Sequence, residues 1–169
     1  IEEDDDSFIL MEYFKSRPLS TMIGKETGPI PFEDAFPIFK QILEGIGYAH
    51  KKKIIHRDIK PSNILINKNN EIKVSDFGIA KPTEDEGGMK ITKAGALIGT
   101  PYYMAPEQIK GLSADHRSDI YSLGVTLYET LAGRLPFRHT SDFDIRNAQV
   151  HDSPPDPRDF YPHIPENIV

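Results

Sequence analysis

The stretch His56-Arg57-Asp58-Ile59-Lys60-Pro61-Ser62-Asn63 is the part of the sequence that decides the fold. It follows the apolar pair Ile54-Ile55, and it gathers three charged side chains and one amide within eight residues. A second motif, Asp76-Phe77-Gly78, follows another short apolar run. Together the two motifs supply a carboxylate that can act as a base, a cation beside it, and two oxygen ligands for a hard divalent metal.

Composition excludes several classes of protein. The 169 residues are enough for one domain with a sizeable core, and 38% hydrophobic and 27% charged residues are ordinary for a globular chain. The net charge of -6 gives no basic surface, so we expect no nucleic acid as a partner. The absence of cysteine excludes disulfides, thiol nucleophiles and Cys-ligated zinc.

The hydropathy of the chain and its first residues bear on the cellular location of the protein. No apolar run approaches the ~20 residues that span a bilayer. The acidic start, residues 1–6, is not a signal peptide, and there is no initiator Met. We therefore expect a piece of a longer protein in the cytoplasm, or the cytosolic part of a membrane-anchored protein. Any membrane attachment would come from segments outside this chain.

Hydrophobic patterning predicts the elements of the first half. The apolar run 8–14 predicts a buried strand, and residues 19–23 predict a short helix that Gly24 ends. Pro31 is suited to a helix start, and a helix is predicted over 33–52, with Pro37 expected to distort its first turns. Its predicted buried stripe consists of Phe36, Phe39, Ile42, Leu43, Ile46 and Ala49.

A hairpin is predicted next, from runs 64–66 and 72–74 joined by the turn residues 67–70. It would place Asn63 and Asp76 at its two outer ends, close enough to share a metal site. Residues 78–97 have no clear period, which indicates a functional or mobile loop.

In the second half, a central helix is predicted over 118–132, ended by Gly133, with Ile120, Leu123, Leu127 and Leu131 as one buried stripe. A weaker helix follows at 142–150, and the proline-rich end has no regular pattern. The expected fold class is α+β in a single domain, without internal repeats.

The polar motifs together match the needs of phosphoryl transfer. Asp58 would orient an acceptor hydroxyl and take its proton, and Lys60 would neutralise charge on the transferred group. Asn63 and Asp76 would hold Mg²⁺ on nucleotide phosphates. Each residue alone has a plainer reading: Asp58 as a helix cap, Lys60 as a solvated tip, Asn63 as a turn residue. Their joint occurrence in this order favours the chemical reading.

The segments IIHRDIKPSNILI, VSDFGIAK, GTPYYMAPEQ and RSDIYSLGVTLYETLAGRLPF resemble the eukaryotic-like (Hanks-type) protein Ser/Thr kinases of bacteria. The resemblance runs from about Phe8 to Phe137 and continues more faintly to the end. It implies a protein-kinase-like fold over 1–169. Residues 1–14 would be the end of the N-lobe and the hinge, and 15–169 most of the mainly helical C-lobe, truncated before its last helices. The rest of the N-lobe would precede Ile1.

The resemblance also implies a nucleotide site for ATP with Mg²⁺, or Mn²⁺ as an alternative. Met11 would stand at the gatekeeper position behind the adenine. The main chain of Glu12 and Phe14 would bind the adenine edge, and Leu65 would pack under the ring. An ordinary core leucine is the plainer reading of Leu65.

Supporting roles follow in the same way. His56 and Phe77 resemble members of a stacked hydrophobic spine, Gly78 completes the metal-loop motif, and Glu107 ends the APE motif. Asp119 matches the aspartate that holds the catalytic loop by its main chain; an acidic residue in a first helical turn is its plainer reading.

Specificity and regulation are also implied. Thr100 matches the threonine that touches Asp58 and Lys60 in Ser/Thr kinases. Arg57 resembles the arginine that pairs with a phosphorylated loop, for which Thr92 is the first candidate and Thr83 the second.

The expected function is a protein serine/threonine kinase that transfers the ATP γ-phosphate to hydroxyls of protein substrates. The isolated chain is expected to be inactive. A non-catalytic kinase-like scaffold is the alternative, and a small-molecule phosphotransferase is a third. Scaffolds usually lose the base or the metal aspartate, whereas this chain has both Asp58 and Asp76.

Overall fold

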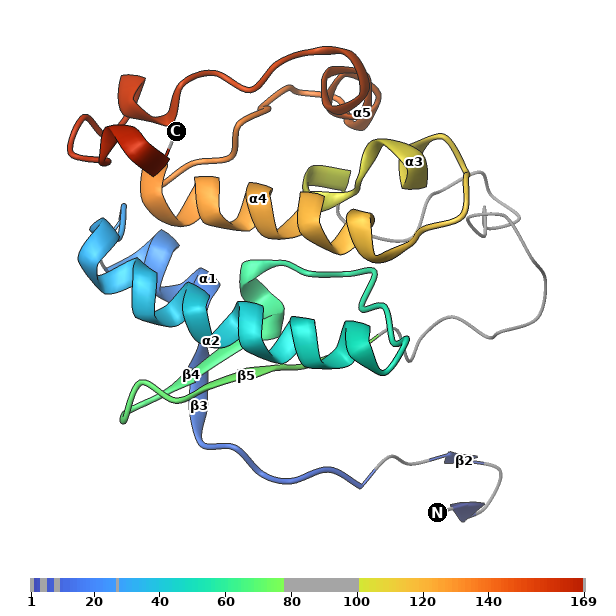
Figure 1. The fold of residues 1–169 in the computed structure, drawn as a ribbon. Coiled ribbons are helices and arrows are strands. Elements are labelled where there is room, and N and C mark those ends of the chain that lie inside the picture. The colour runs from blue at the N-terminus through green and yellow to red at the C-terminus, as the bar shows by residue number, and fades with distance from the viewer. Residues whose placement is uncertain (1, 4–5, 8–9, 27, 78–100, 169) are drawn as a thin grey trace.

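The computed structural model describes residues 2–3, 6–7, 10–26, 28–77 and 101–168. Two long helices, α2 (Phe32–Lys51) and α4 (His116–Ala132), lie side by side and form the middle of the molecule (Figure 1). A small antiparallel sheet of order β3-β4-β5 packs against α2 on the side away from α4. Its strands are β3 (Ser16–Pro18), β4 (Ile64–Asn67) and β5 (Ile72–Val74). The predicted α+β class is confirmed.

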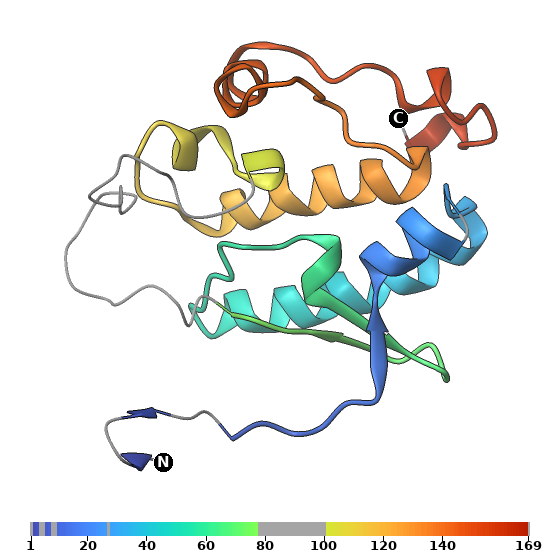
Figure 2. The ribbon, with the colours of Figure 1, turned by 180° about the vertical axis from the view of Figure 1, so that it is seen from behind.

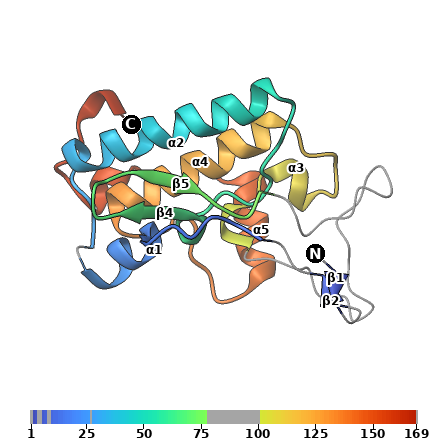
Figure 3. The ribbon, with the colours of Figure 1, turned by 90° about the horizontal axis from the view of Figure 1, so that it is seen from below.

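The shorter elements flank these layers. Helix α5 (Asp142–His151) and the segments that follow it lie over α4, on the face away from the sheet (Figure 2). Seen from below, the β4–β5 hairpin lies between α1 (Leu19–Thr21) and α2 (Figure 3). The remaining elements are the strand pair β1 (Glu2–Glu3) and β2 (Asp6–Ser7), the π-helix Met22–Glu26, the helix α3 (Pro106–Ile109), and 3-10 turns at Pro61–Asn63, Pro101–Tyr103, Pro157–Asp159 and Glu166–Ile168.

Helix α2 forms because one face carries apolar residues at helical spacing. The residues buried on it are Ala35, Ile38, Phe39, Ile42, Ile46 and Ala49. The prediction that Phe36 and Leu43 share this face was wrong, because their side chains are 57% and 55% exposed and lie on the flank of the stripe. Pro37 does not break the helix. It is exposed on the solvent side, where water can solvate the carbonyl that lacks a partner N–H.

Helix α4 is capped at both ends. The side chain of Asp115 accepts a 2.7 Å hydrogen bond from the N–H of Arg117, and Gly133 ends the helix at φ 69°, as predicted. A methyl group on Gly133 would stand 2.8 Å from Cγ of Pro29, so only glycine fits this position.

The buried face of α4 is less apolar than predicted, because it includes a row of hydroxyl groups. Thr126 and Thr130 are fully buried, and each hydroxyl donates to the carbonyl one turn earlier, at 2.8 and 2.7 Å. Paired in this way, hydroxyls can replace apolar side chains in a core. Ile120, which the predicted stripe includes, is 57% exposed instead.

The predicted buried strand 8–14 was wrong over its described part. Residues 10–15 have no regular structure, and Leu10, Met11 and Tyr13 are 86%, 70% and 86% exposed. Residues 8 and 9 lie outside the described part. An apolar run forms a buried strand only where a second surface covers it. Here the side-chain contacts are made by Lys73, whose Nζ lies 2.5 Å from Glu12 Oε2 and 4.9 Å from the Phe14 ring.

The N-terminal helix also differs from the prediction. Gly24 does not end it, because the chain continues as a π-helix to Glu26. Strand β3, which pairs with β4, was not predicted. The hairpin prediction is confirmed, with Ile64 opposite Val74 and Ile66 opposite Ile72. In the part of the chain that the structure describes, no helix has the length and apolar character to span a bilayer.

Candidate active site

The stretch 56–63 lies between α2 and β4, and several of its side chains are buried in the core while others are exposed. His56 and Ile59 are fully buried, whereas Arg57 and Asp58 are exposed. Ile59 belongs to the same apolar cluster as Ile42 of α2. Burial of these anchors fixes the loop and leaves the Asp58 side chain facing solvent.

The His56 ring is bonded on both nitrogens. Its Nδ1 accepts the N–H of Asp58 at 3.2 Å, so Nε2 carries the hydrogen and donates to the carbonyl of Ser75 at 2.9 Å. The ring also packs on Phe77, with centroids 4.5 Å apart. His56 therefore links the stretch 56–63 to Ser75 and Phe77 through one side chain.

Asp119, in the first turn of α4, is fully buried beneath the same stretch. Its Oδ1 accepts the N–H of Arg57 at 2.8 Å, and its Oδ2 accepts the N–H of His56 at 2.9 Å. His50 of α2 contributes a third bond, from Nε2 to Oδ2 at 2.7 Å. Arg57 adopts φ 68°, a conformation that residues other than glycine rarely take, and the Asp119 carboxylate holds it there.

Asp58 lies between two donors. Lys60 Nζ is 2.8 Å from Asp58 Oδ2, and Asn63 Nδ2 is 3.2 Å from the same oxygen and 2.9 Å from the Asp58 carbonyl. The Asp58 side chain is 51% exposed, and that of Lys60 is 22% exposed. The three groups thus form a compact cluster with a carboxylate open to an incoming hydroxyl.

Asn63 and Asp76 lie at the outer ends of the hairpin, and Ser75 connects them. The N–H of Ser75 donates to the Asn63 carbonyl at 2.9 Å, and its hydroxyl donates to Asp76 Oδ2 at 2.9 Å. Because Asn63 Nδ2 is committed to Asp58, its Oδ1 is the atom left for a metal; it has one long contact, 3.4 Å, with the Ser62 hydroxyl.

A carboxylate and an amide oxygen suit Mg²⁺ that is bound mainly through nucleotide phosphates and water. Within the described ranges, no group of three or more His, Asp or Glu side chains is arranged to hold a metal without such help. The donor set therefore fits a metal that arrives with a phosphorylated ligand.

The residues expected around the adenine are half-buried or exposed. Leu65 of β4 is half-buried, as is Phe14, while Met11 and Glu12 are exposed. The residues Gly78, Thr83, Thr92 and Thr100, named from the sequence, lie outside the described part of the chain.

The segment 101–109 is attached to α4 and α5. Tyr103 OH donates to Glu129 Oε2 at 2.6 Å, and Gln149 Nε2 donates to the Tyr102 carbonyl at 2.7 Å. Burial raises the pKa of Glu129, and the hydrogen bond from Tyr103 offsets part of that rise. Glu107 accepts a 2.5 Å hydrogen bond from the Ser118 hydroxyl on α4.

Sequence reasoning missed three contributors to this arrangement: His50, Ser75 and Gln108. His50 follows Ile42, Ile46 and Ala49 on the buried side of α2, and that spacing could have indicated a buried partner. Gln108 Nε2 donates to the Arg57 carbonyl at 3.2 Å. This contact and that of His56 with the Ser75 carbonyl leave no sequence signal, because both involve main-chain carbonyls.

Known proteins match this chain over almost its whole length. A family model described as the protein kinase domain matches residues 1–164. The serine/threonine-protein kinase PrkC of Bacillus subtilis is 39% identical over 167 residues, which is 99% of this chain and 25% of the relative. PknB of Mycolicibacterium smegmatis is 41% identical over 150 residues, 89% of this chain and 24% of the relative.

A probable serine/threonine-protein kinase of Clostridium perfringens, CPE1738, is 37% identical over 166 residues, 98% of this chain and 24% of the relative. The chain thus spans about a quarter of the length of these curated relatives. With the family model matched from residue 1 to residue 164 and the motif residues gathered at one site, this chain belongs to the protein kinase domain family.

Proposed function

We propose that the protein is an ATP-dependent serine/threonine kinase that acts on protein substrates. The observation that carries this proposal is the position of the Asp58 carboxylate, exposed between Lys60 Nζ at 2.8 Å and Asn63 Nδ2 at 3.2 Å. A phosphoryl acceptor needs a base at its hydroxyl and a cation at the transferred group, and this cluster supplies both. The names of the relatives, all serine/threonine kinases, agree with this assignment.

In the proposed mechanism, Asp58 orients the acceptor hydroxyl and takes its proton as the new P–O bond forms. Lys60 neutralises charge on the transferred phosphoryl group. Asn63 Oδ1 and the Asp76 carboxylate would hold Mg²⁺, or Mn²⁺, on the ATP phosphates. That ion supplies neutralisation of the phosphate charge when it is bound. Ser75 keeps the two ligands adjacent through its bonds to both.

For the nucleotide base, we propose contacts with Met11, the main chain of Glu12 and Phe14, and the half-buried Leu65. In this assignment residues 1–14 connect two lobes and 15–169 belong to the larger one. Selection of serine and threonine would rest on Thr100.

Regulation by phosphorylation of Thr92 or Thr83 would act through Arg57, whose side chain is exposed and whose N–H is held by Asp119. We propose a cytoplasmic location, no nucleic-acid partner, and membrane attachment only through other segments of the protein.

The test is Asp58→Asn in the full-length protein. The substitution keeps the shape of the side chain but removes the base, so transfer of phosphate from labelled ATP should fall by about 10²–10⁴-fold. Affinity for ATP should stay within about twofold, because Asp58 contacts the acceptor and not the nucleotide.

Asp115→Asn is the matched control, since Asp115 is an exposed helix cap and asparagine caps equally well. Unchanged transfer in the Asp58→Asn protein would overturn the base assignment. Nucleotide binding with no transfer in the unmodified protein would instead identify a kinase-like scaffold.

A further inference from the structure

A side chain of α3 contacts the main chain of the stretch 56–63. Gln108 Nε2 donates to the Arg57 carbonyl at 3.2 Å, and Gln108 Oε1 accepts the N–H of Ala105 at 3.0 Å. The two partners fix which end of the amide is which, since an N–H must meet the oxygen and a carbonyl must meet the NH₂ group. Gln108 therefore joins α3 to that stretch through one side chain.

The bond to Ala105 is an ordinary helix cap. Gln108 is the third residue of α3, and a Gln or Glu at that position commonly accepts the main-chain N–H of the capping residue. Glutamate would serve this purpose equally well. The bond to Arg57 is different, because a carboxylate has no hydrogen to donate and would repel the carbonyl. The choice between glutamine and glutamate at position 108 therefore matters only for the contact with Arg57.

The peptide unit between Arg57 and Asp58 is held at both of its polar groups. Its carbonyl accepts the hydrogen bond from Gln108, and its N–H donates to His56 Nδ1 at 3.2 Å. Asp119 holds the two preceding N–H groups instead. The Cα of Asp58 follows this peptide unit directly. The orientation of the unit therefore sets the direction in which the Asp58 carboxylate leaves the main chain.

The other end of the Gln108 amide is attached to buried structure. Ala105, whose N–H it accepts, is fully buried. Two residues earlier, the carbonyl of Tyr103 accepts a 2.7 Å hydrogen bond from the Ser122 hydroxyl of α4. The attachment of this segment to α4 therefore fixes the donor that the Arg57 carbonyl meets.

We propose that Gln108 is a positioning residue, which orients Asp58 through the Arg57 carbonyl and couples the segment 101–105 to the proposed base. This role rests on the proposed function. A displacement of about 1 Å at a reacting group can slow a reaction by about 10²-fold, so loss of one orienting bond should be measurable in the rate of transfer. Gln108 is not among the residues proposed to bind ATP, so the affinity for ATP should not change with it.

Gln108→Glu in the full-length protein removes one bond and keeps the other. The variant still accepts the N–H of Ala105, but it cannot donate to the Arg57 carbonyl. Phosphate transfer in a single turnover at saturating ATP should be about three- to tenfold slower, which is the range expected of one hydrogen bond, while KM for ATP stays within about twofold. If Gln108 only caps α3, the rate should not change.

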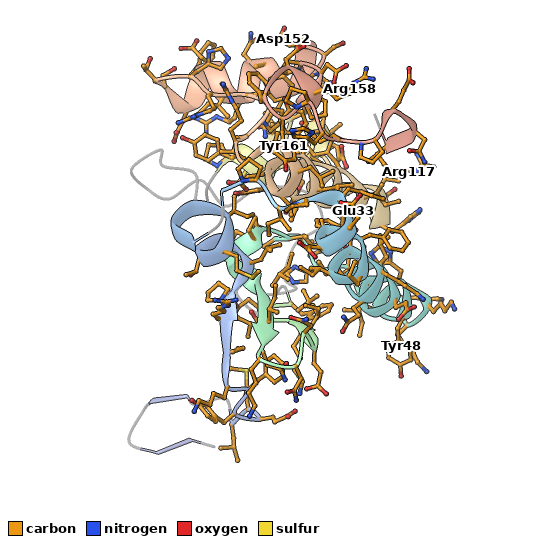
Figure 4. The ribbon with its side chains drawn as sticks, turned by 90° about the vertical axis from the view of Figure 1, so that its left-hand side faces the viewer. Glu33, Tyr48, Arg117, Asp152, Arg158 and Tyr161 are labelled. Carbon is orange, nitrogen blue, oxygen red and sulfur yellow. The ribbon has the colours of Figure 1, made fainter. Side chains whose placement is uncertain are left out.

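Gln41→Glu is the matched control, because it makes the same chemical change elsewhere. Gln41 lies on α2 between Glu33 and Tyr48, both of which Figure 4 labels. Its Oε1 accepts the N–H of Ile72 at 3.1 Å, and its Nε2 donates to the Asn70 carbonyl at 2.9 Å. These partners lie at the turn end of the hairpin and not at its outer ends, so the control should transfer phosphate at the unmodified rate.

The amide signal of Asp58 in NMR spectra gives a readout that needs no activity. Because this N–H shares a peptide unit with the Arg57 carbonyl, its signal should shift in the Gln108→Glu protein and stay in place in the Gln41→Glu protein. The proposal is overturned by an unchanged rate in Gln108→Glu, by an equal loss in Gln41→Glu, or by an unchanged Asp58 signal. If the unmodified protein transfers no phosphate, the proposed function fails, and the amide signal alone decides whether Gln108 orients Asp58.

Discussion

Asp119 Oδ1 accepts a 2.8 Å hydrogen bond from the N–H of Arg57, although 62 residues separate the two in the chain. Arg57 adopts φ 68°, which costs a residue with a Cβ about 1–2 kcal/mol. The cost is offset because the buried carboxylate at the start of α4 accepts two successive main-chain N–H groups, from His56 and Arg57. The first turn of α4 therefore determines where the next side chain, Asp58, points.

Replacement of Asp119 by asparagine should destabilise the protein. The carboxylate accepts three hydrogen bonds, from His50, His56 and Arg57. An amide offers one oxygen and turns an NH₂ group toward a donor, so at least one buried N–H loses its acceptor. We expect a loss of about 1–3 kcal/mol in the free energy of unfolding, measured by urea denaturation.

Asp115→Asn makes the same chemical change four residues earlier, at the exposed N-cap of α4. It should change the free energy of unfolding by less than about 0.5 kcal/mol, because asparagine and aspartate cap helices equally well. Equal losses in the two variants would show that the buried network around Asp119 has no special role.

Two glycines of one helix should respond to alanine in opposite directions. At Gly133, alanine must adopt φ 69° and places its Cβ 2.8 Å from Pro29 Cγ, so we expect a loss of about 2 kcal/mol or more. At Gly124, inside α4, a Cβ meets nothing within 4 Å, and alanine should add about 0.5–1 kcal/mol of stability.

Thermal and urea denaturation of the two variants measure this difference. A stabilised Gly133→Ala protein would contradict the left-handed helix end, and a destabilised Gly124→Ala protein would contradict the open space beside α4.

The fold could be predicted wherever a segment carried its own signal. Helix α2 was predicted to within one residue at each end, because its apolar residues recur at helical spacing, and the hairpin of β4 and β5 followed from its turn residues. The prediction of a buried strand was wrong over residues 10–14 because burial of Leu10 and Met11 depends on a surface that the sequence of the run does not encode. Strand β3 was not predicted because three residues that include a proline show no strand pattern.

The proximity of the candidate site residues could be predicted from the sequence, but their connections to the rest of the fold could not. Asp58, Lys60 and Asn63 stand within six positions, so their proximity follows from local spacing. The bonds of His56 to Ser75 and of Gln108 to Arg57 end on carbonyl oxygens, which every residue possesses. Only the folded arrangement of the hairpin and α3 shows which of them are used.

If Asp76 holds Mg²⁺ as proposed, removal of the Ser75 hydroxyl should weaken metal binding without removing a ligand. That hydroxyl donates to Asp76 Oδ2 at 2.9 Å, and partners of this kind orient a metal-binding carboxylate. Ser75→Ala in the full-length protein should raise the Mg²⁺ concentration for half-maximal phosphate transfer by about tenfold. Ser62→Ala is the control, since its hydroxyl makes only a 3.4 Å contact with Asn63 Oδ1 and should have little effect. Equal Mg²⁺ requirements in all three proteins would argue against Asp76 as a ligand.

Glu129 should make the stability of the protein depend on pH. Burial raises the pKa of this carboxyl in the folded state, and the hydrogen bond from Tyr103 reverses only part of the rise. Between the pKa of the unfolded chain, about 4.3, and the higher folded value, the folded state therefore holds more protons than the unfolded state. Stability must fall as pH rises through that window.

Glu129→Gln removes this titration, while its amide oxygen can still accept the hydrogen bond that Tyr103 donates. Relative to the unmodified protein, the variant should gain stability as pH rises from about 4.3 toward neutral, and the difference should then level off. Urea denaturation at a series of pH values measures the difference directly. Glu44→Gln, on the exposed face of α2, is the control for a change in net charge alone. A difference that stays constant with pH, or a loss that grows as pH rises, would mean that the Glu129 carboxyl is not destabilised by burial.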